Sequence, residues 1–274
     1  TGASGTILTS TDGMSWTSRT SGKTEYLRGV TYDGVGLFVA VGDTGTILTS
    51  SDNGTTWTSR TSGTTSNLEG GVTHGNNTFV AVSTGGVIVT STEGTTWDNR
   101  TSGTTNHLYG VTFGNNTFVG VGLSGQIIRS TDNGNNWSLS KMIADEKNTE
   151  FEEPAVVLLP NGNIFMLLRE NISTIIHSII SKDKGISWTK PKKTELEGYP
   201  ADLLILQEGL LACVTGNRKK PYQILMYTSD DFGETWSDKI VVKNNLINQD
   251  LGYPTIAQRK NGEIVIIYYA QNKQ

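Results

Sequence analysis

The octapeptide Ser50-Ser51-Asp52-Asn53-Gly54-Thr55-Thr56-Trp57 recurs with drift through the chain, and this repetition constrains the fold more than any other feature. The chain contains six tryptophans, and every one of them closes a copy of the octad. A pattern that includes every tryptophan indicates a repeat protein, in which each repeat forms one supersecondary unit that packs on its neighbours. The six residues are Trp16, Trp57, Trp97, Trp137, Trp188 and Trp236.

The octad template, Ser-x-Asp-x-Gly-x-Thr-Trp, is typical of a tight turn between two strands. A short carboxylate accepts hydrogen bonds from turn N–H groups, glycine takes the positive φ, and tryptophan buries a large ring against the sheet. Two copies drift, because Thr11 and Thr92 occupy the aspartate position and Asp12 and Glu93 follow one place later. We therefore interpret the aspartates of the complete copies as turn residues and not as catalysts; they are Asp52, Asp132, Asp183 and Asp231.

The spacing of the octads predicts the architecture. Successive tryptophans are 41, 40 and 40 residues apart as far as Trp137. Between them lie short β-branched or aromatic segments bounded by Gly, Asn or Asp, such as Leu27 to Thr31 and Leu37 to Val41. Four strands in about 40 residues is the size of one β-propeller blade.

The composition changes after residue 140. All six prolines and thirteen of the fourteen lysines lie beyond this point, and the tryptophan spacings lengthen to 51 and 48. The strand pattern persists, with Ala155 to Leu159 and Ile164 to Leu168 flanking a Pro160-Asn161-Gly162 turn. We expect residues 1–140 and 141–274 to be half-rings of one propeller and not two domains.

The chain ends complete the predicted fold. The N-terminus supplies only the third and fourth strands of a blade, and the C-terminus only the first and second strands. The sequence therefore predicts an all-β, single-domain propeller over residues 1–274. It would have six blades of four antiparallel strands, closed by a composite blade from both termini that leaves no unpaired edge.

The octad resembles the Asp-box of the sialidase (neuraminidase) superfamily and of BNR-repeat proteins. In that family the boxes lie between the third and fourth strands of propeller blades and are structural. Residues 1–140 resemble tandem-repeat bacterial propellers related to photosystem II assembly factors, whereas residues 150–274 resemble sialidases. A natural recombinant and an engineered chimera both fit this division, and we favour the engineered chimera.

Composition excludes several classes of function. The net charge of −4 gives no footprint for nucleic acid or membrane binding, and no apolar run approaches the length of a membrane span. No signal peptide is recognisable, and the start at Thr1 suggests a trimmed chain. The single cysteine, Cys213, excludes an intrachain disulfide and is expected to be a buried strand thiol. No Cys/His spacing predicts a metal, no cofactor is expected, and we expect a monomer whose localisation stays open.

The topology of a blade separates two faces. In a meander, the first strand begins and the second strand ends on one face, and the octads lie on the other. In the second half of the chain the first of these faces collects acidic, basic and aromatic residues; they are Glu153, Arg169, Tyr199, Arg218, Asp250 and Tyr253.

The sialidase resemblance implies roles for these residues. In sialidases a glutamate activates a tyrosine nucleophile, because a carboxylate nucleophile would be repelled by the carboxylate of the sugar. The matching positions are Tyr253 as nucleophile and Glu153 as its base. The resemblance also places Arg169 and Arg218 as arginines that clamp the sugar carboxylate bidentately. Tyr199 and Asp250 fall beside them as substrate-binding residues.

The sequence also departs from the family. No Arg-Ile-Pro segment with the first clamp arginine occurs, and no family-type aspartate acid/base is present. We therefore predict a catalytically incomplete sialidase-like propeller that acts as a scaffold or as a weak binder of a glycan or small carboxylate at a central pocket. The first half offers other residues at the same mouth, namely Tyr26, Asp43, Asn67, Asn106 and His107.

Two alternatives remain open. One is an active exo-sialidase-like glycoside hydrolase with the tyrosine nucleophile and with an acid from Asp43 or another first-half residue. The other is an interaction platform that uses the Thr- and Asn-rich blades.

Overall fold

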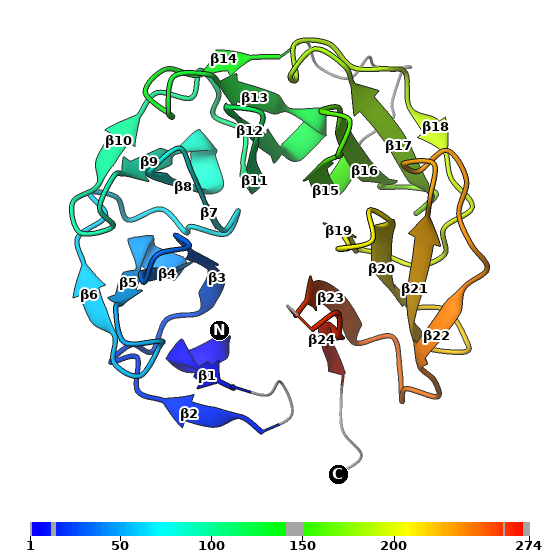
Figure 1. Ribbon diagram of the computed structural model, residues 1–274, viewed down its shortest axis with the longest axis horizontal. Helices are drawn as coiled ribbons and strands as arrows, with labels where there is room; N and C mark the ends of the chain where they lie inside the picture. The colour runs from blue at the N-terminus through cyan, green and yellow to red at the C-terminus, as the bar shows by residue number, and fades with distance from the viewer. Residues whose placement is uncertain (1, 12–14, 141–150, 260, 271–274) are drawn as a thin grey trace. The chain divides into compact units, whose positions relative to one another are not determined.

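The computed structural model describes residues 2–11, 15–140, 151–259 and 261–270 (Figure 1). Asp12 of the first octad and Lys260 of the last turn lie outside the described residues. Contacts divide the chain into two compact units, Thr1–Met142 and Ile143–Gln274, and this boundary falls two residues after the change of composition. The helices of the described residues are short 3-10 turns, η1 Ala3–Gly5, η2 Asp43–Gly45, η3 Thr84–Gly86 and η4 Leu123–Gly125.

The unit Thr1–Met142 contains a two-stranded sheet followed by three four-stranded antiparallel blades, each made of consecutive strands. The two-stranded sheet is β1 (Ile7–Thr9) with β2 (Thr17–Arg19). The blades are β3 (Leu27–Tyr32), β4 (Phe38–Gly42), β5 (Ile47–Ser50) and β6 (Thr58–Arg60); β7 (Val72–Gly75), β8 (Thr78–Val82), β9 (Ile88–Ser91) and β10 (Asp98–Arg100); and β11 (Leu108–Gly114), β12 (Thr117–Gly122), β13 (Ile127–Ser130) and β14 (Ser138–Leu139).

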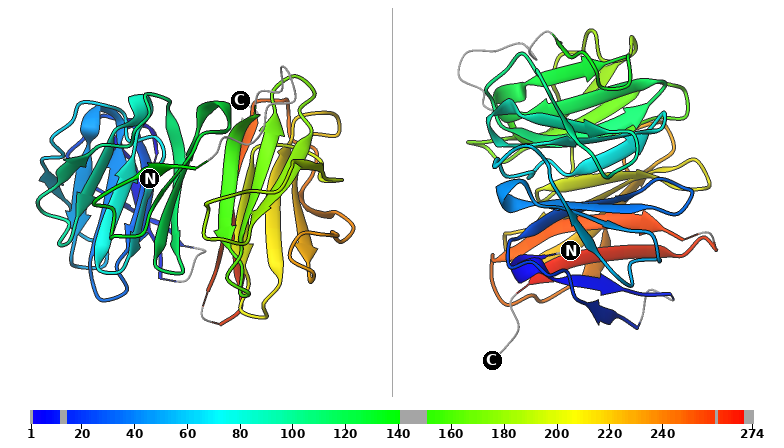
Figure 2. Two further views of the ribbon diagram at one scale, coloured as in Figure 1. Left: turned by 90° about the horizontal axis from the view of Figure 1, so that it is seen from above. Right: turned by 90° about the vertical axis from the view of Figure 1, so that its left-hand side faces the viewer.

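The unit Ile143–Gln274 contains two such blades and a final two-stranded sheet. Figure 2 shows the strands of these sheets running alongside one another. The blades are β15 (Phe151–Leu158), β16 (Ile164–Glu170), β17 (Ile176–Ser181) and β18 (Lys192–Lys193); and β19 (Ala201–Ile205), β20 (Leu211–Asn217), β21 (Gln223–Ser229) and β22 (Ile240–Lys243). The last sheet pairs β23 (Leu251–Gln258) with β24 (Ile264–Ala270).

The structure confirms an all-β propeller fold with four-stranded antiparallel blades, but the predicted count of six blades is wrong. Five blades have four strands, and β1–β2 and β23–β24 remain separate two-stranded sheets, with no ladder between β24 and β1 among the described residues. Each complete blade joins consecutive strands by short turns whose closure costs little entropy. A composite blade would instead need a ladder between the two ends of the chain, which belong to different units.

The octads form the turns between the third and fourth strands. In the second octad, Asp52 Oδ1 accepts hydrogen bonds from Ser50 Oγ at 2.8 Å and from the Thr56 N–H at 2.9 Å. Its Oδ2 accepts from Thr56 Oγ1 at 2.7 Å, and Ser50 Oγ accepts from the Gly54 N–H at 2.9 Å. Gly54 has a φ of +78°, which an L side chain rarely adopts. The same contacts recur around Asp132, Asp183 and Asp231.

The octad tryptophans differ between the units. In the first unit the outer strand begins directly after the tryptophan, and Trp57 Nε1 donates to the Gly54 carbonyl at 2.9 Å. In the second unit β18 and β22 begin four residues after Trp188 and Trp236, so the tryptophan does not start the strand there. The Nε1 atoms of these two residues are buried without a hydrogen-bond partner in the described part of the chain.

The core of each unit lies between the faces of adjacent blades. In the first unit Trp97 packs with Phe79, their ring centroids 6.3 Å apart, among Val39 and other fully buried side chains. In the second unit Phe165 and Cys213 belong to one buried cluster, and both are fully buried. Burial raises the pKa of the Cys213 thiol, so this cysteine is an apolar core group.

The packing predicts unequal roles for two octad tryptophans. Trp97 is 8% exposed, and Trp97→Ala should destabilise the protein by about 3–5 kcal/mol because it leaves a cavity in the core. Trp16 is 45% exposed, and Trp16→Ala should cost less than about 1 kcal/mol. Urea unfolding followed by circular dichroism measures both free energies, and equal losses would contradict this description of the core.

The octad carboxylates also predict a pH dependence. Hydrogen bonds from the Thr235 hydroxyl and N–H lower the pKa of Asp231 to about 2. Because this value lies below that of an unfolded aspartate, the stabilisation is complete above about pH 4 and is lost as the pH falls towards 2. The stability difference between wild type and Asp231→Asn should therefore shrink over this interval in urea titrations. Asp230→Asn, one residue away, is the control, and a difference that stays constant with pH would refute the prediction.

Candidate functional site

Two prolines interrupt the first strands of their sheets in the second unit. A proline has no N–H to donate to the ladder, so the pairing must break around it. The β15–β16 register shifts between Glu152 and Ala155, and the β23–β24 register shifts between Gly252 and Thr255. Glu153 and Tyr253, each directly before its proline, therefore lie in matching bulges.

The bulges hold both residues in an unusual backbone conformation. Glu153 has a φ of +48° and Tyr253 a φ of +42°. Non-glycine residues in this region cost on the order of 1–3 kcal/mol each, and such residues concentrate at binding and catalytic sites. The strain redirects both side chains from the alternation of a regular strand.

The two bulges meet through their side chains. Tyr253 Oη donates a hydrogen bond to Glu153 Oε1 at 2.9 Å. Arg169, near the end of β16, donates from Nε to Glu153 Oε2 at 2.7 Å and from Nη2 to Glu152 Oε2 at 2.5 Å. Burial lowers the pKa of Arg169, but the hydrogen bonds and charges of Glu153 and Glu152 outweigh burial and raise it.

Arg218 completes the cluster with aromatic contacts. Its guanidinium carbon lies 5.6 Å from the ring centroid of Tyr253 and 5.4 Å from that of Tyr199, while the Arg169 guanidinium lies 5.0 Å from Tyr199. Arg218 Nε and Nη2 are buried without a hydrogen-bond partner in the described residues. Buried donors on a charged group are costly when they remain unpaired, so these two atoms mark unused capacity for an anion.

Glycines allow the two sheets to approach at this point. A Cβ on Gly216 would lie 2.9 Å from the Gly252 Cα, and a Cβ on Gly252 would lie 3.1 Å from Arg218 Nη2. Gly252 has a φ of +135°, which also favours glycine. The absence of side chains here brings the start of β23 over the Arg218 guanidinium.

The structure brings five of the six predicted site residues together: Glu153, Arg169, Tyr199, Arg218 and Tyr253. None of the contacts above involves Asp250, which is exposed directly before β23 and donates its N–H to Asn248 Oδ1 at 2.9 Å. Asp202 also has a structural use, since its Oδ2 accepts from Thr255 Oγ1 at 2.7 Å and ties β19 to β23.

The sequence reasoning did not assign Glu152 to the site. Adjacent residues in a regular strand point to opposite faces, so a regular strand would keep Glu152 and Glu153 from sharing a partner. The bulge removes this alternation, and both carboxylates reach Arg169. The proline directly after the Glu-Glu pair was the available signal.

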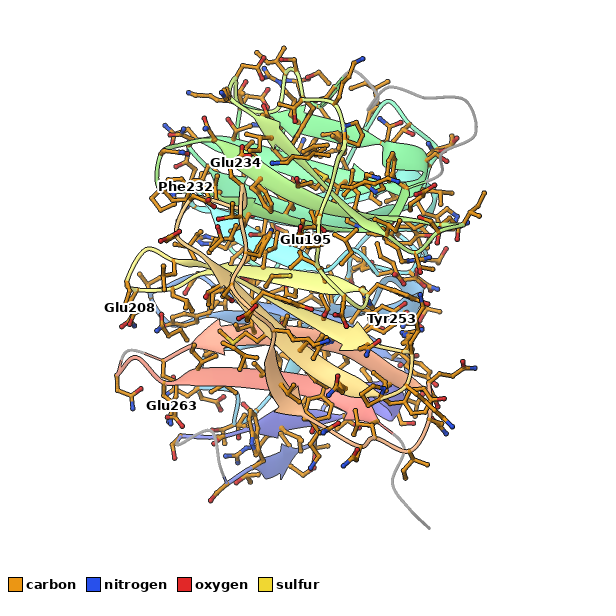
Figure 3. The ribbon with its side chains drawn as sticks, turned by 90° about the vertical axis from the view of Figure 1, so that its right-hand side faces the viewer. Glu195, Glu208, Phe232, Glu234, Tyr253 and Glu263 are labelled. Atoms are coloured by element: carbon orange, nitrogen blue, oxygen red, sulfur yellow. The ribbon has the colours of Figure 1, made fainter. Side chains whose placement is uncertain are left out.

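The cluster and the octads lie at opposite ends of the strands in the second unit. Figure 3 shows Tyr253 on the right, with Phe232 and Glu234 of the last octad and the turn residues Glu208 and Glu263 on the left. Tyr253 is 58% exposed, so its phenol is accessible from solvent.

The first-unit residues that the sequence offered as alternative site residues form a separate network of contacts. Arg28 donates to both carboxylate oxygens of Asp43, from Nε at 2.8 Å and from Nη2 at 2.9 Å, and its guanidinium lies 5.0 Å from the Tyr26 ring centroid. Asn67 Oδ1 accepts from the Thr44 N–H at 2.9 Å. Both oxygens of Asp43, the alternative acid, are thus engaged by Arg28.

The other candidate residues of the first unit contact residues of their own unit, and a hollow lies on the same unit. The rings of His107 and Tyr109 are tilted to each other with centroids 6.0 Å apart, and Asn106 Nδ2 donates to the Leu123 carbonyl at 3.5 Å. A hollow of about 680 Å³ is lined wholly by first-unit residues, among them Lys23, Glu25 and Arg60. It is open and is built mainly from a threonine-rich loop, and it gathers none of the cluster residues.

No group of three or more His, Cys, Asp or Glu side chains among the described residues could hold a metal ion. None of the helices in that part of the chain could span a membrane.

Comparison with known sequences identifies one family. Residues 29–266 match the family described as BNR repeat-like domain, which covers most of both units. No curated protein matches the sequence.

Solved structures show the same fold. A protein of unknown function from Dyadobacter fermentans is similar with a TM-score of 0.67 at 19% identity, over 92% of each chain. YCF48 bound to D1 peptide has a TM-score of 0.64 at 17% identity, over 89% of this chain and 75% of that one. A Hadza microbial sialidase has a TM-score of 0.54 at 15% identity, over 84% of this chain and 60% of that one. Identities this low establish the propeller fold alone.

The glycine contact generates a prediction. Gly252→Ala should destabilise the protein by about 1–3 kcal/mol because of its φ, and its Cβ should displace the Arg218 guanidinium. Gly209→Ala is the control, since Gly209 has a φ of +85° with no atom within 4 Å of its Cβ position. Phenylglyoxal labelling with mass spectrometry reports on Arg218. Faster labelling in Gly252→Ala but not in Gly209→Ala is expected, and equal labelling would contradict the contact.

Proposed function

The chain belongs to the BNR repeat-like domain family, and we propose that its unit Ile143–Gln274 weakly binds the carboxylate of an acidic sugar and hydrolyses its glycosides poorly or not at all. The observation that carries this proposal is the Arg218 guanidinium, whose buried Nε and Nη2 have no partner among the described residues and lie beside the exposed Tyr253. A carboxylate is the ligand that arginine hydrogen-bonds most effectively.

The hydrogen bonds that Arg169 already makes within the protein support weak binding of a ligand carboxylate. Its Nε and Nη2 already donate to Glu153 and Glu152, and Nη1 lies 3.5 Å from Asn171 Oδ1. An incoming carboxylate would have to compete with two glutamates for this arginine. Gly252 also covers one edge of Arg218, so an anion would reach that group from the Nη1 side or with a shift of β23.

The carboxylates of the cluster explain why hydrolysis would be poor. Glycoside hydrolysis needs a carboxylic acid to protonate the leaving group, in addition to the nucleophile and its base. Within the described residues of this unit, Glu153 accepts from Tyr253 and Arg169, and Glu152 accepts from Arg169. Asp202 accepts from the Ile256 N–H in the middle of β23. None of these three is left to act as the acid.

A second candidate function is sialidase-type hydrolysis. The hydrogen bond from Tyr253 to Glu153 at 2.9 Å favours it, because this is the contact through which a base would activate a tyrosine nucleophile.

The proposal also includes two origins for the chain, in which the first unit serves as a scaffold. It is supported by the different octads of the two units. The first unit places its outer strands directly after the tryptophans, and the second unit places them four residues later. The lengthened spacings and the shift in proline and lysine content follow the same division.

Calorimetric titration with N-acetylneuraminic acid tests the binding proposal. We expect a Kd in about the millimolar range for the wild type and a loss of at least about tenfold in Arg218→Ala. The methyl ester of the same sugar is the matched ligand, and it should not bind measurably because it lacks the charge. Equal affinity for acid and ester would overturn the proposal.

Hydrolysis of a fluorogenic sialoside distinguishes the two candidates. We expect a rate near that of buffer for the wild type and no change in Tyr253→Phe. Robust turnover that is abolished in Tyr253→Phe would instead establish the second candidate.

A further inference from the structure

Three successive sheets of the second unit have a proline near the start of their first strand, and a glutamate or tyrosine directly precedes each proline. The pairs are Glu153-Pro154, Tyr199-Pro200 and Tyr253-Pro254. The first and last supply the hydrogen-bonded Glu153 and Tyr253. Tyr199 occupies the equivalent position in the middle sheet, so the architecture presents its side chain at the same cluster.

Tyr199 contacts both arginines of the cluster. Its ring centroid lies 5.0 Å from the Arg169 guanidinium carbon and 5.4 Å from that of Arg218. Both distances are within the range of a cation–π interaction. Among the described residues, no other ring makes this contact with both of them.

Arg218 depends on such contacts for its position. Arg169 is held by two glutamates, but the buried Nε and Nη2 of Arg218 have no hydrogen-bond partner in the described residues. The ring faces of Tyr199 and Tyr253 are its identified electrostatic support. The negative face of an aromatic ring attracts a guanidinium without using its N–H groups. A ligand that enters from the Nη1 side, or after a shift of β23, can therefore still hydrogen-bond to them.

The backbone around Tyr199 is fixed. Its N–H donates to the Gly216 carbonyl at 3.0 Å, which ties it to β20. Gly198 before it has a φ of +84°, and a Cβ there would lie 2.8 Å from the Gly216 carbonyl carbon. A ring on such a tightly packed backbone can define where both arginines lie.

We infer that Tyr199 is a positioning residue, whose ring holds Arg169 and Arg218 beside each other so that their remaining N–H groups form one carboxylate site. This assigns Tyr199 a role through the arginines and not through direct contact with the sugar. The inference rests on the carboxylate-binding function proposed above, but its first test needs no ligand.

The ligand-free test measures the mobility of Arg218. In Tyr199→Leu we expect faster phenylglyoxal labelling of Arg218, while Tyr199→Phe, which keeps the ring face, should label at the wild-type rate. Tyr32→Leu is the matched control, because the Tyr32 ring packs on Phe38 in the first unit at 4.6 Å. Unchanged labelling in Tyr199→Leu would overturn the inference.

The ligand test measures affinity for N-acetylneuraminic acid. Tyr199→Leu should weaken binding by about five- to thirtyfold, and Tyr199→Phe by no more than about twofold. If the wild type does not bind the acid but Tyr199→Leu still frees Arg218 for labelling, the proposed function fails and the positioning role stands. If the wild type binds and Tyr199→Leu binds equally well, the positioning role fails alone.

A third series keeps the inference testable if Tyr199→Leu does not fold. Mono-, di- and trifluorinated phenylalanine at position 199 preserve the ring shape while withdrawing electron density from its face. A positioning role through cation–π attraction predicts labelling of Arg218 that rises with each added fluorine. A purely steric role predicts no such trend, and that result would overturn the inference.

Discussion

The fold depends on the carboxylate that closes each complete octad turn. One aspartate accepts from a serine hydroxyl, a backbone N–H and a second side chain, so the third and fourth strands are joined by a turn with few unsatisfied polar groups. Hydrogen bonds to the ionised form lower the pKa of Asp52 to about 2, which keeps the carboxylate charged across physiological pH. A group committed in this way to its own turn is unsuited to proton transfer, and the site lies at the other end of the strands.

That site depends on a second constraint, the missing N–H of proline. A regular first strand would alternate its side chains, and Glu152, Glu153 and Arg169 could not converge. The bulges at Pro154 and Pro254 replace alternation by positive-φ residues, and Tyr253 reaches Glu153. The glycines at 216 and 252 let β20 and β23 approach closely beside them. The resulting strain is local, and it is offset by the ladders on either side.

The electrostatics of the cluster favour recognition over chemistry. Arg169 pairs with two glutamates, whereas Arg218 lies beside two tyrosine rings with two buried donors that have no partner in the described part of the chain. An unpaired buried cation is stabilised most by an anion, so the cluster is preorganised for a carboxylate in the absence of ligand. Catalysis would need a further acid. In the described part of the second unit, the carboxylates of Glu152, Glu153 and Asp202 are engaged in other contacts.

The sequence alone determined the blade repeat, the position of the octads and the residues that gather at the opposite face, because turn chemistry and strand alternation are local. It did not determine the blade count, since the predicted composite blade required a ladder between chain ends in different units. It also gave Glu152 no role, because a bulge changes the direction of a side chain without changing the residue pattern. Only the tertiary structure decided that Arg169 pairs with two glutamates while two donors of Arg218 have no partner among the described residues. The first state follows from the bulge in β15, and the second from the packing of β23 on the Arg218 guanidinium.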